Sequence, residues 1–253
     1  MITLNEKLQN IRNKLSDFLN SQSQSSKICA FRVSHIPTQI ENVDVGINKI
    51  PLYAVDSVPY VITENDLRGL TEIGYWMFYH CKSLTSVAIP NSVTNIMGGA
   101  FWYCESLTSV TIPDSVTRIE NNAFNSCYSL TSITIPDSVT WIGDGAFYEC
   151  ESLTNITIPD SVTWIGNNAF SYCTSLANAT IRGNITTIGY NLFYGCSNLA
   201  NIYIHSATPP ALSYTYAIPD HTTIHVPVGS GDAYRNATNW SYHSARIVEN
   251  SAL

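Results

Sequence analysis

Two stretches, Ile135-Pro-Asp-Ser-Val-Thr-Trp-Ile-Gly-Asp-Gly-Ala-Phe147 and Ile158-Pro-Asp-Ser-Val-Thr-Trp-Ile-Gly-Asn-Asn-Ala-Phe170, are nearly identical and begin 23 residues apart. The same interval separates successive cysteines at Cys81, Cys104, Cys127, Cys150, Cys173 and Cys196. It also separates leucines from Leu84 to Leu199 and phenylalanines from Phe78 to Phe193. A constant period of this length indicates a solenoid, in which each copy forms one coil and contacts only its neighbours.

Each copy contains a pattern typical of a strand, a turn and a second extended segment. Val110 and Ile112 alternate along the chain, which places both on one face of a predicted strand. Pro113-Asp-Ser115 then ends the strand, because proline cannot donate to a ladder and Asp and Ser side chains stabilise turns. Val116 and Ile119 follow as a shorter extended segment.

The remainder of the coil predicts one helical turn. Ala123, Phe124 and Cys127 are spaced i, i+1, i+4, which points all three toward the same side of a helix. A lone coil is unstable, because ordering its backbone costs about 1–2 kcal/mol per residue and its few apolar side chains recover too little. We therefore predict an α/β repeat in which about five full coils stack between capped ends.

Charged residues are few, and most of them are acidic. They make up 12% of the chain, against roughly 25% in typical soluble domains, so Ser, Thr, Asn and Tyr supply much of the surface. From residue 84 onward the chain has eleven acidic residues and only four arginines, which accounts for the net charge of −7. Such a surface repels phosphate groups, so we expect no nucleic acid and no anionic membrane as partner.

Membrane insertion is not expected either, since no apolar run approaches the roughly 20 residues that cross a bilayer. The N-terminus lacks the apolar core of a signal peptide, because Glu6, Lys7 and Arg12 interrupt it. The predicted location is therefore a virion or the cytoplasm, unless the protein is exported by another route.

The N-terminal 20 residues differ from the repeat and predict an amphipathic helix. Its apolar seam is formed by Leu4, Leu8, Ile11, Leu15 and Phe18. Such a short helix is marginal alone, so it either packs on the cap or joins copies of itself in a homo-oligomer. The predicted division of the chain is the helix at 1–20, a linker and β/turn segment at 21–60, the solenoid at 61–205 and a C-terminal cap at 206–253.

The repeat resembles the BspA-like (Treponema pallidum type) bacterial leucine-rich repeat family. The similarity covers residues 67–205, and the motif I-P-D-S-V-T-x-I-G-x-x-A-F is nearly intact where it begins at Ile112, Ile135 and Ile158. The resemblance implies a leucine-rich-repeat solenoid with 23-residue coils. It also implies adhesion or partner binding at a bacterial cell surface.

The C-terminal residues also resemble the end of proteins in this family. Residues 224–228 are expected to form a final strand, and residues 232–235 a short helix that begins at Asp232. Trp240, Tyr242 and Ile247 are expected to cover the last coil.

Two periodic rows invite a metal or disulfide interpretation, but each has a simpler one. Side chains in register on stacked coils lie about 4.8 Å apart, farther than the roughly 3.8 Å between the Cβ atoms of a disulfide. The cysteines are therefore predicted to be buried free thiols. Asp114, Asp137 and Asp160 each lie between Pro and Ser, which is a turn signature. We expect neither a metal nor a cofactor, because no Cys/His metal spacing occurs.

Aromatic residues at variable positions of the coil are the candidate binding residues. Trp141 and Trp164 stand where other coils carry Asn95, Arg118 and Thr187, so packing of the repeat does not demand a ring there. Exposed aromatic side chains are typical of contacts with proteins and sugars, although they can also cover the edge of a coil. The other candidates are Tyr148, Tyr172, Trp102 and Tyr103.

The expected function is non-enzymatic recognition of a protein or glycan, because no convergent acid, base and nucleophile is visible. Two settings besides bacterial adhesion stay open. The protein could be a phage tail or fibre accessory that contacts the host, or an intracellular scaffold for protein interactions.

Overall fold

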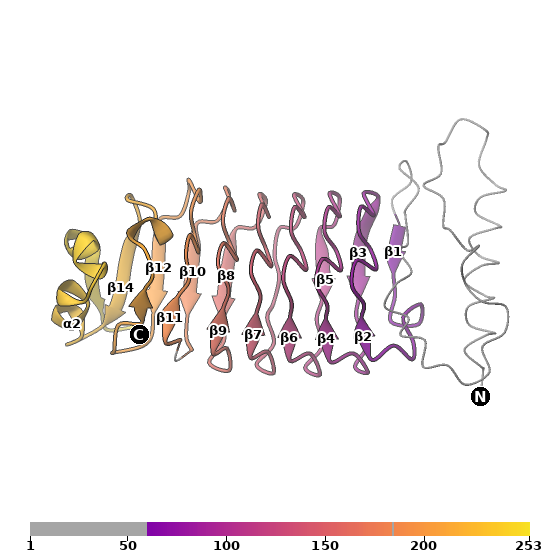
Figure 1. Cartoon of the computed structure of the whole chain (residues 1–253), viewed down its shortest axis with the longest axis horizontal. Helices are drawn as coiled ribbons and strands as arrows, with labels where there is room; N and C mark the ends of the chain where they lie inside the picture. Colours follow the sequence, from indigo (N-terminus) through magenta and orange to yellow (C-terminus); the bar gives the residue numbers. More distant parts are fainter. Residues whose placement is uncertain (1–59, 184) are drawn as a thin grey trace.

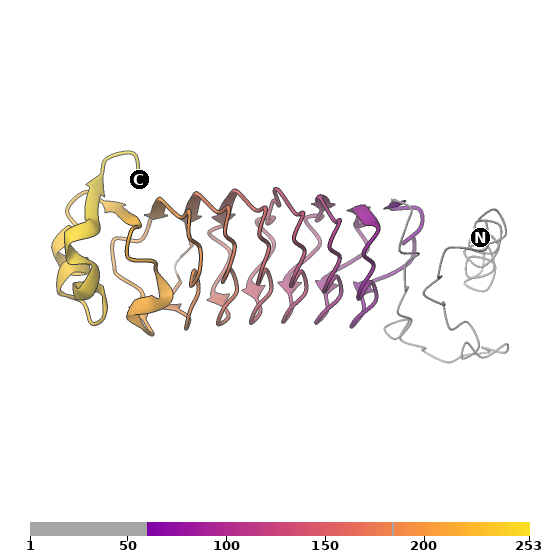
Figure 2. The same cartoon turned by 90° about the horizontal axis from the view of Figure 1, so that it is seen from above.

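The computed structural model describes residues 60–183 and 185–253. They form a parallel β-solenoid of about eight turns, stacked along the long axis with the C-terminal helices at one end (Figures 1 and 2). The predicted solenoid of 23-residue coils is thereby confirmed. The stack is longer than the five full coils expected, because the degenerate copies at both ends also form turns.

The first strands of the coils line up in one row, which contains two parallel sheets. The first sheet joins β1 (Tyr60–Ile62), β3 (Leu84–Ala88) and β5 (Ser109–Thr111). The second joins β8 (Asn155–Ile158), β10 (Asn178–Ile181), β12 (Asn201–Ile204), β14 (Thr223–Pro227) and β15 (Ile247–Asn250). The intervening coil continues the row. The Thr131 N–H donates to the Thr108 carbonyl at 3.4 Å, and the Thr131 carbonyl accepts a hydrogen bond from the Thr154 N–H at 3.3 Å.

A second row of two-residue strands confirms the predicted second extended segment. One sheet contains β2 (Glu72–Ile73), β4 (Asn95–Ile96), β6 (Arg118–Ile119), β7 (Trp141–Ile142) and β9 (Trp164–Ile165). A separate pair joins β11 (Thr187–Ile188) to β13 (Ala211–Leu212). Neighbours pair in parallel, so Ile142 lies between Ile119 and Ile165. Residues one period apart therefore occupy the same place on consecutive coils.

The predicted helical turn at Ala123, Phe124 and Cys127 is wrong, although all three side chains are buried as expected. The segment forms successive tight turns, in which the Cys127 N–H donates to the Phe124 carbonyl at 3.3 Å. Asn122 and Ser126 have φ values of 56° and 57°, which a right-handed helix excludes. The Phe124 N–H instead donates to a carbonyl of the next coil at 2.8 Å.

The core consists of ladders that run the length of the stack. The buried phenylalanine rings from Phe78 to Phe193 stack with centroids 5.0 to 5.8 Å apart. The six periodic cysteines are free thiols and fully buried, as predicted. The Pro-Asp-Ser segments form the predicted turns, and in one of them the Ser115 hydroxyl donates to the Val93 carbonyl of the preceding coil at 2.6 Å.

The C-terminal end closes the core with β14, α2 (Gly231–Asn236), η3 (Trp240–Arg246) and β15, after a short η2 (Thr215–Ala217). The expected final strand and short helix are confirmed, although the helix begins at Gly231 and not at Asp232. Trp240 is fully buried and donates its Nε1–H to the Pro210 carbonyl at 2.7 Å, and Ile247 is also buried. Tyr242 does not cover the coil, since 54% of its surface is exposed.

Several predictions concern residues outside the described part of the chain. They are the N-terminal helix with its seam of Leu4, Leu8, Ile11, Leu15 and Phe18, and the linker after it. Within residues 60–183 and 185–253, no helix is long and apolar enough to cross a membrane.

Candidate interaction surface

Trp141 and Trp164 form an aromatic stack at the surface of the second strand row. Strands β6, β7 and β9 align Arg118, Trp141 and Trp164 in register. The two indole rings are stacked, with centroids 5.2 Å apart and planes inclined by 14°. The Arg118 guanidinium lies over the other side of Trp141, with Cζ 4.7 Å from the ring centroid. We call these three residues the Trp stack.

The Trp stack is partly exposed and electrostatically balanced. Trp164, at its end, exposes 42% of its surface. Arg118 Nε forms an ion pair with Glu120 Oε1 at 2.7 Å, which orients the guanidinium. The indole Nε1 of Trp141 is buried and has no hydrogen-bond partner among the described residues. The stack therefore offers a flat apolar ring beside a charge that is already compensated.

Tyr148 and Tyr172 lie on the turn segments and contact each other edge to face, with centroids 5.5 Å apart. Tyr172 makes a similar contact with Tyr194 on the next coil. Tyr172 stands one position later in its coil than the other two, and its φ of 59° is left-handed. Burial raises the pKa of the Tyr148 hydroxyl, and the nearby Glu149 carboxylate raises it further.

Trp102 and Tyr103 belong to an aromatic cluster near the N-terminal end of the described solenoid. Their rings are stacked with centroids 5.7 Å apart. Trp76 of the preceding coil stacks on Trp102 at 5.0 Å, and His80 lies 4.7 Å from Tyr103. Tyr79 packs edge-on between them. Trp76 is exposed, so this cluster also presents an aromatic surface to solvent.

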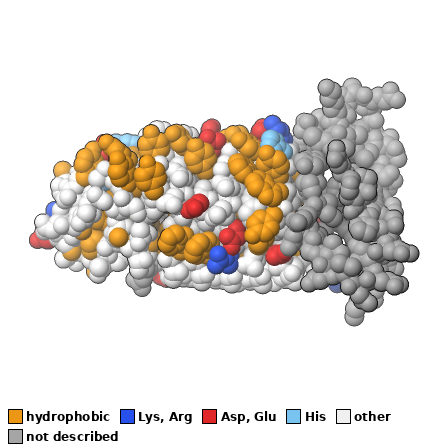
Figure 3. All heavy atoms as spheres, in the orientation of Figure 1, with side chains coloured by type: hydrophobic (Ala, Val, Ile, Leu, Met, Phe, Trp, Pro, Cys, Tyr) orange, Lys and Arg blue, Asp and Glu red, His pale blue; other side chains and the backbone are white. Residues whose placement is uncertain are grey.

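The six predicted residues therefore fall into three groups and do not form one patch. Among the described rings, no contact joins the Trp stack to either of the other groups. Hydrophobic side chains gather in separate areas along the face drawn in Figure 3, with polar surface between them. Trp141 and Tyr148 are close in the sequence but lie on different segments of one coil, so sequence spacing alone does not show this separation.

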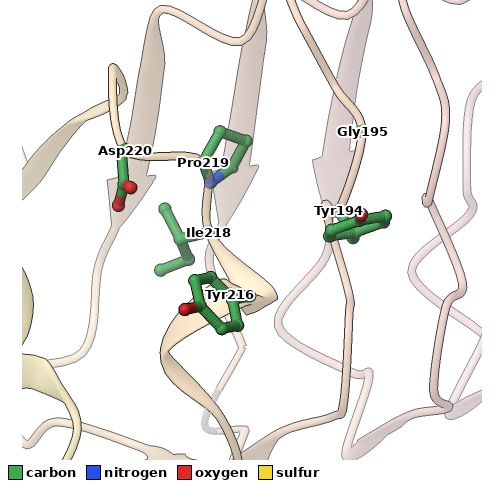
Figure 4. A pocket seen from close by; sticks show the side chains of 6 residues that line it. All are labelled: Tyr194, Gly195, Tyr216, Ile218, Pro219 and Asp220. Atoms are coloured by element: carbon green, nitrogen blue, oxygen red, sulfur yellow. The ribbon is translucent and has the colours of Figure 1, made fainter.

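Sequence reasoning also missed exposed tyrosines toward the C-terminal end. They are Tyr190, Tyr194, Tyr214 and Tyr216. Tyr194 and Tyr216 flank a small pocket of about 170 Å³ with Ile218, Pro219 and Asp220 (Figure 4). A signal was available for Tyr194, which stands one period after Ser171 and two after Tyr148.

Within residues 60–183 and 185–253, no group of three or more His, Cys, Asp or Glu side chains is placed to hold a metal ion. In the cap, burial and the neighbouring Arg246 guanidinium lower the pKa of His243 to about 4. His243 is therefore neutral near pH 7 and packs against Trp240 and Tyr242.

Comparison with known proteins places this solenoid among leucine-rich repeats. The model of the BspA type leucine rich repeat region matches residues 1–108 and 96–217, in six copies. A leucine-rich repeat protein of T. pallidum is 30% identical, with a TM-score of 0.56 over 64% of this chain and 79% of that chain. No curated protein matches the sequence.

A second similar structure is a leucine-rich repeat protein from Bacteroides ovatus. It is 27% identical, with a TM-score of 0.54 over 73% of this chain. The match covers 52% of that protein, so the chain corresponds to about half of its length.

Proposed function

Because the chain belongs to the family of BspA type leucine-rich repeats, we propose that it is a non-enzymatic recognition module that binds a protein partner through the Trp stack. Leucine-rich-repeat solenoids are typically interaction scaffolds rather than enzymes. The observation that carries the proposal is the parallel stacking of Trp164 on Trp141 at the surface, with Arg118 over the inner ring.

The composition of the Trp stack is that of an interface anchor. Trp and Arg are enriched among the interface residues whose truncation costs the most binding energy. Covering the exposed ring of Trp164 would remove apolar area from water without moving the backbone, because β7 and β9 already hold both rings. A rigid ring loses little conformational entropy when it is bound.

The fold does not require these rings. Asn95 on β4 and Thr187 on β11 occupy the same position of the coil and form the same short strand. The buried Nε1–H of Trp141 has no partner among the described residues, and an unpaired buried donor costs stability. The rings are therefore better explained by binding than by packing.

The expected partner is a protein whose contact surface is apolar and not strongly acidic. The chain has eleven acidic residues and four arginines from residue 84 onward. An acidic partner would therefore be repelled on approach. Glu120 already pairs with Arg118, which leaves no free cation in the stack to attract a carboxylate.

Affinity capture with the full chain tests the proposal. Protein extracts from the source cells and from cells on which they grow are passed over the immobilised protein and over its Trp141→Ser, Trp164→Ser variant. The original chain should retain a partner that the variant does not. The affinity of the variant for that partner should be at least about 30-fold lower than that of the original chain. Asn95→Ser is the matched control, because it changes the same position on a coil outside the stack.

Equal capture by the variant and the original chain would show that the rings do not bind. Thermal unfolding of the variant must be measured alongside, because a large loss of stability would mean that the rings are structural cover.

The setting that we propose is adhesion at a bacterial cell surface, which the family resemblance supports. Cell fractionation tests it independently of the partner. Recovery with the surface fraction would support adhesion. Recovery in purified phage particles would instead support a tail or fibre role, and recovery only in the cytosol would support a scaffold.

A further inference from the structure

A polar hollow opens among the turn segments in the middle of the solenoid. Its lining comes from three consecutive coils and consists of Asn122, Asn125, Asp144, Gly145, Tyr148, Asn167 and Asn168. Its volume is about 330 Å³, and it is widely open to solvent. The hollow shares no residue with the Trp stack, so it is a separate site.

Gly145 contributes no side chain to the lining of the hollow. Asn122, Gly145 and Asn168 follow one another at the same position of consecutive coils, each with positive φ. At Gly99, in the same row, the gap is filled, since a Cβ there would meet the Trp76 ring at 2.6 Å. At Gly145 a Cβ would meet Asn122 Oδ1 at 2.5 Å, so the Asn122 amide occupies the corresponding space. An amide thus stands there in place of a ring.

The amides of the hollow are oriented by bonds to their oxygens. Asn122 Oδ1 accepts a hydrogen bond from Asn125 Nδ2 at 2.9 Å, and Asn167 Oδ1 accepts one from the Tyr190 N–H at 2.8 Å. Asn168 Oδ1 accepts a hydrogen bond from the Ser171 hydroxyl of its own coil at 3.5 Å. Among the described residues, the Nδ2 groups of these three asparagines donate no bond to the protein. The three amide groups therefore keep unused donors beside the hollow.

The rest of the lining supplies an acceptor and an aromatic ring. Asp144 Oδ1 accepts the Asn167 N–H at 2.6 Å, which leaves Oδ2 available to accept from a ligand. Tyr148 is the aromatic residue of the lining. The lining contains no Lys or Arg, and the Glu149 carboxylate is close enough to raise the pKa of Tyr148. An anionic ligand would thus meet only negative charge.

We propose that this hollow binds a neutral pyranose sugar. Sugar hydroxyls both accept and donate, so one ring can accept from the asparagine amides and donate to Asp144 Oδ2. The C–H face of a sugar can pack on the Tyr148 ring. The donors are held in place before binding, which reduces the ordering cost that a flexible site would carry.

The test is a titration of the full chain with the methyl glycosides of glucose, galactose and mannose, followed by NMR of the asparagine side-chain amides. At least one glycoside should shift the amide signals of Asn122, Asn167 and Asn168 together. The Asn122→Gly, Asn168→Gly variant should weaken that binding by about tenfold or more. Its backbone is compatible, because Gly99 and Gly145 occupy the same row with positive φ.

Asn191→Gly is the matched control, since Asn191 belongs to the same row but does not line the hollow. It should leave the affinity unchanged. Asn167→Asp is a second variant that tests the donors alone, because Asp144 makes the equivalent oxygen contact one coil earlier. It should lose the sugar without loss of thermal stability.

Three results would overturn the site. One is the absence of any response to all three glycosides, and another is an unchanged affinity in both variants. The third is binding of methyl glucuronide as tight as that of methyl glucoside, which would contradict a site for neutral sugars. The Trp141→Ser, Trp164→Ser variant should bind the sugar as the original chain does. A failure of the sugar site can therefore be told apart from a failure of the proposed protein contact.

Discussion

The thiol of Cys127 donates a hydrogen bond to the carbonyl oxygen of Phe101 on the preceding coil, at 3.2 Å. The four remaining cysteines from Cys104 to Cys196 make the same bond to the preceding coil. The thiol therefore does more than fill space. It gives a buried carbonyl a second donor while adding only a small apolar side chain.

The first prediction is that the six periodic thiols do not react in the native protein. Burial raises the pKa of Cys127, so it stays protonated, and the thiolate is the reactive form. Titration with a thiol reagent in a Cys29→Ser background should show almost no reaction until denaturant is added. Rapid labelling of several thiols without denaturant would contradict the buried ladder.

The second prediction is a loss of stability at alkaline pH. Burial raises the pKa of Cys104, Cys127, Cys150 and Cys173. The unfolded thiols ionise above about pH 8.5, whereas the native ones keep their protons. The free energy of unfolding is therefore unaffected below that pH, and above it falls by about 1.4 kcal/mol per pH unit for each such thiol.

Urea unfolding between pH 8 and pH 10 checks this. Cys127→Ser removes one titrating group and should make the slope shallower by about 1.4 kcal/mol per pH unit. An identical slope in the variant would mean that Cys127 ionises in the native state.

The third prediction is that Gly166→Ala destabilises the solenoid by about 1–3 kcal/mol, because it overpacks the contact between coils. A Cβ at Gly166 would collide with the backbone nitrogen of Asp144 and lie 2.5 Å from the carbonyl carbon of Gly143. The control is Gly98→Ala, where the nearest atoms are 3.3 Å away. Denaturant unfolding should separate the two variants, and equal stabilities would refute the close approach of the coils.

The fourth prediction distinguishes the two members of the Trp pair. Trp141→Ser loses both the ring stack, worth about 0.5–1.5 kcal/mol, and the cation–π contact with Arg118, worth about 0.5–1 kcal/mol. Trp164→Ser loses only the stack. Trp141→Ser should therefore lower the free energy of unfolding more. Circular dichroism should show loss of the coupled indole signal in both variants, and a larger destabilisation by Trp164→Ser would contradict the geometry.

The fifth prediction concerns the N-terminal seam, which lies outside the described residues. If Leu4, Leu8, Ile11, Leu15 and Phe18 mediate self-association, charged residues at two of these positions should dissociate the oligomer. Light scattering of the full chain and of its Leu8→Glu, Leu15→Glu variant measures this. Monomeric masses for both proteins would exclude the homo-oligomer.

The sequence alone was sufficient for the solenoid, the parallel register and the interior. A constant period places residues such as Phe124 and Phe147 at the same point of consecutive coils, so one inward residue implies the whole ladder. The burial of the cysteines followed from the same argument. The C-terminal strand and helix were also predictable from the local turn residues between them, although Asp232 does not cap the helix.

Only the tertiary structure decided how the turn segments run and which surface residues meet. The spacing of Ala123, Phe124 and Cys127 suits a helical turn, but bonds to the neighbouring coils hold Asn122 and Ser126 in left-handed conformations. Those contacts are not encoded in a single coil. The backbone of the turns depends on the stack as a whole.

The same physical reason separated the predicted binding residues into groups. The buried side chains repeat with the 23-residue period, because every coil must fill the same interior. Contacts between surface side chains depend instead on which segment of the coil carries each residue. Trp141 and Trp164 meet because they share one position on paired strands. Tyr148 and Tyr172 meet although their positions in the coil differ by one residue.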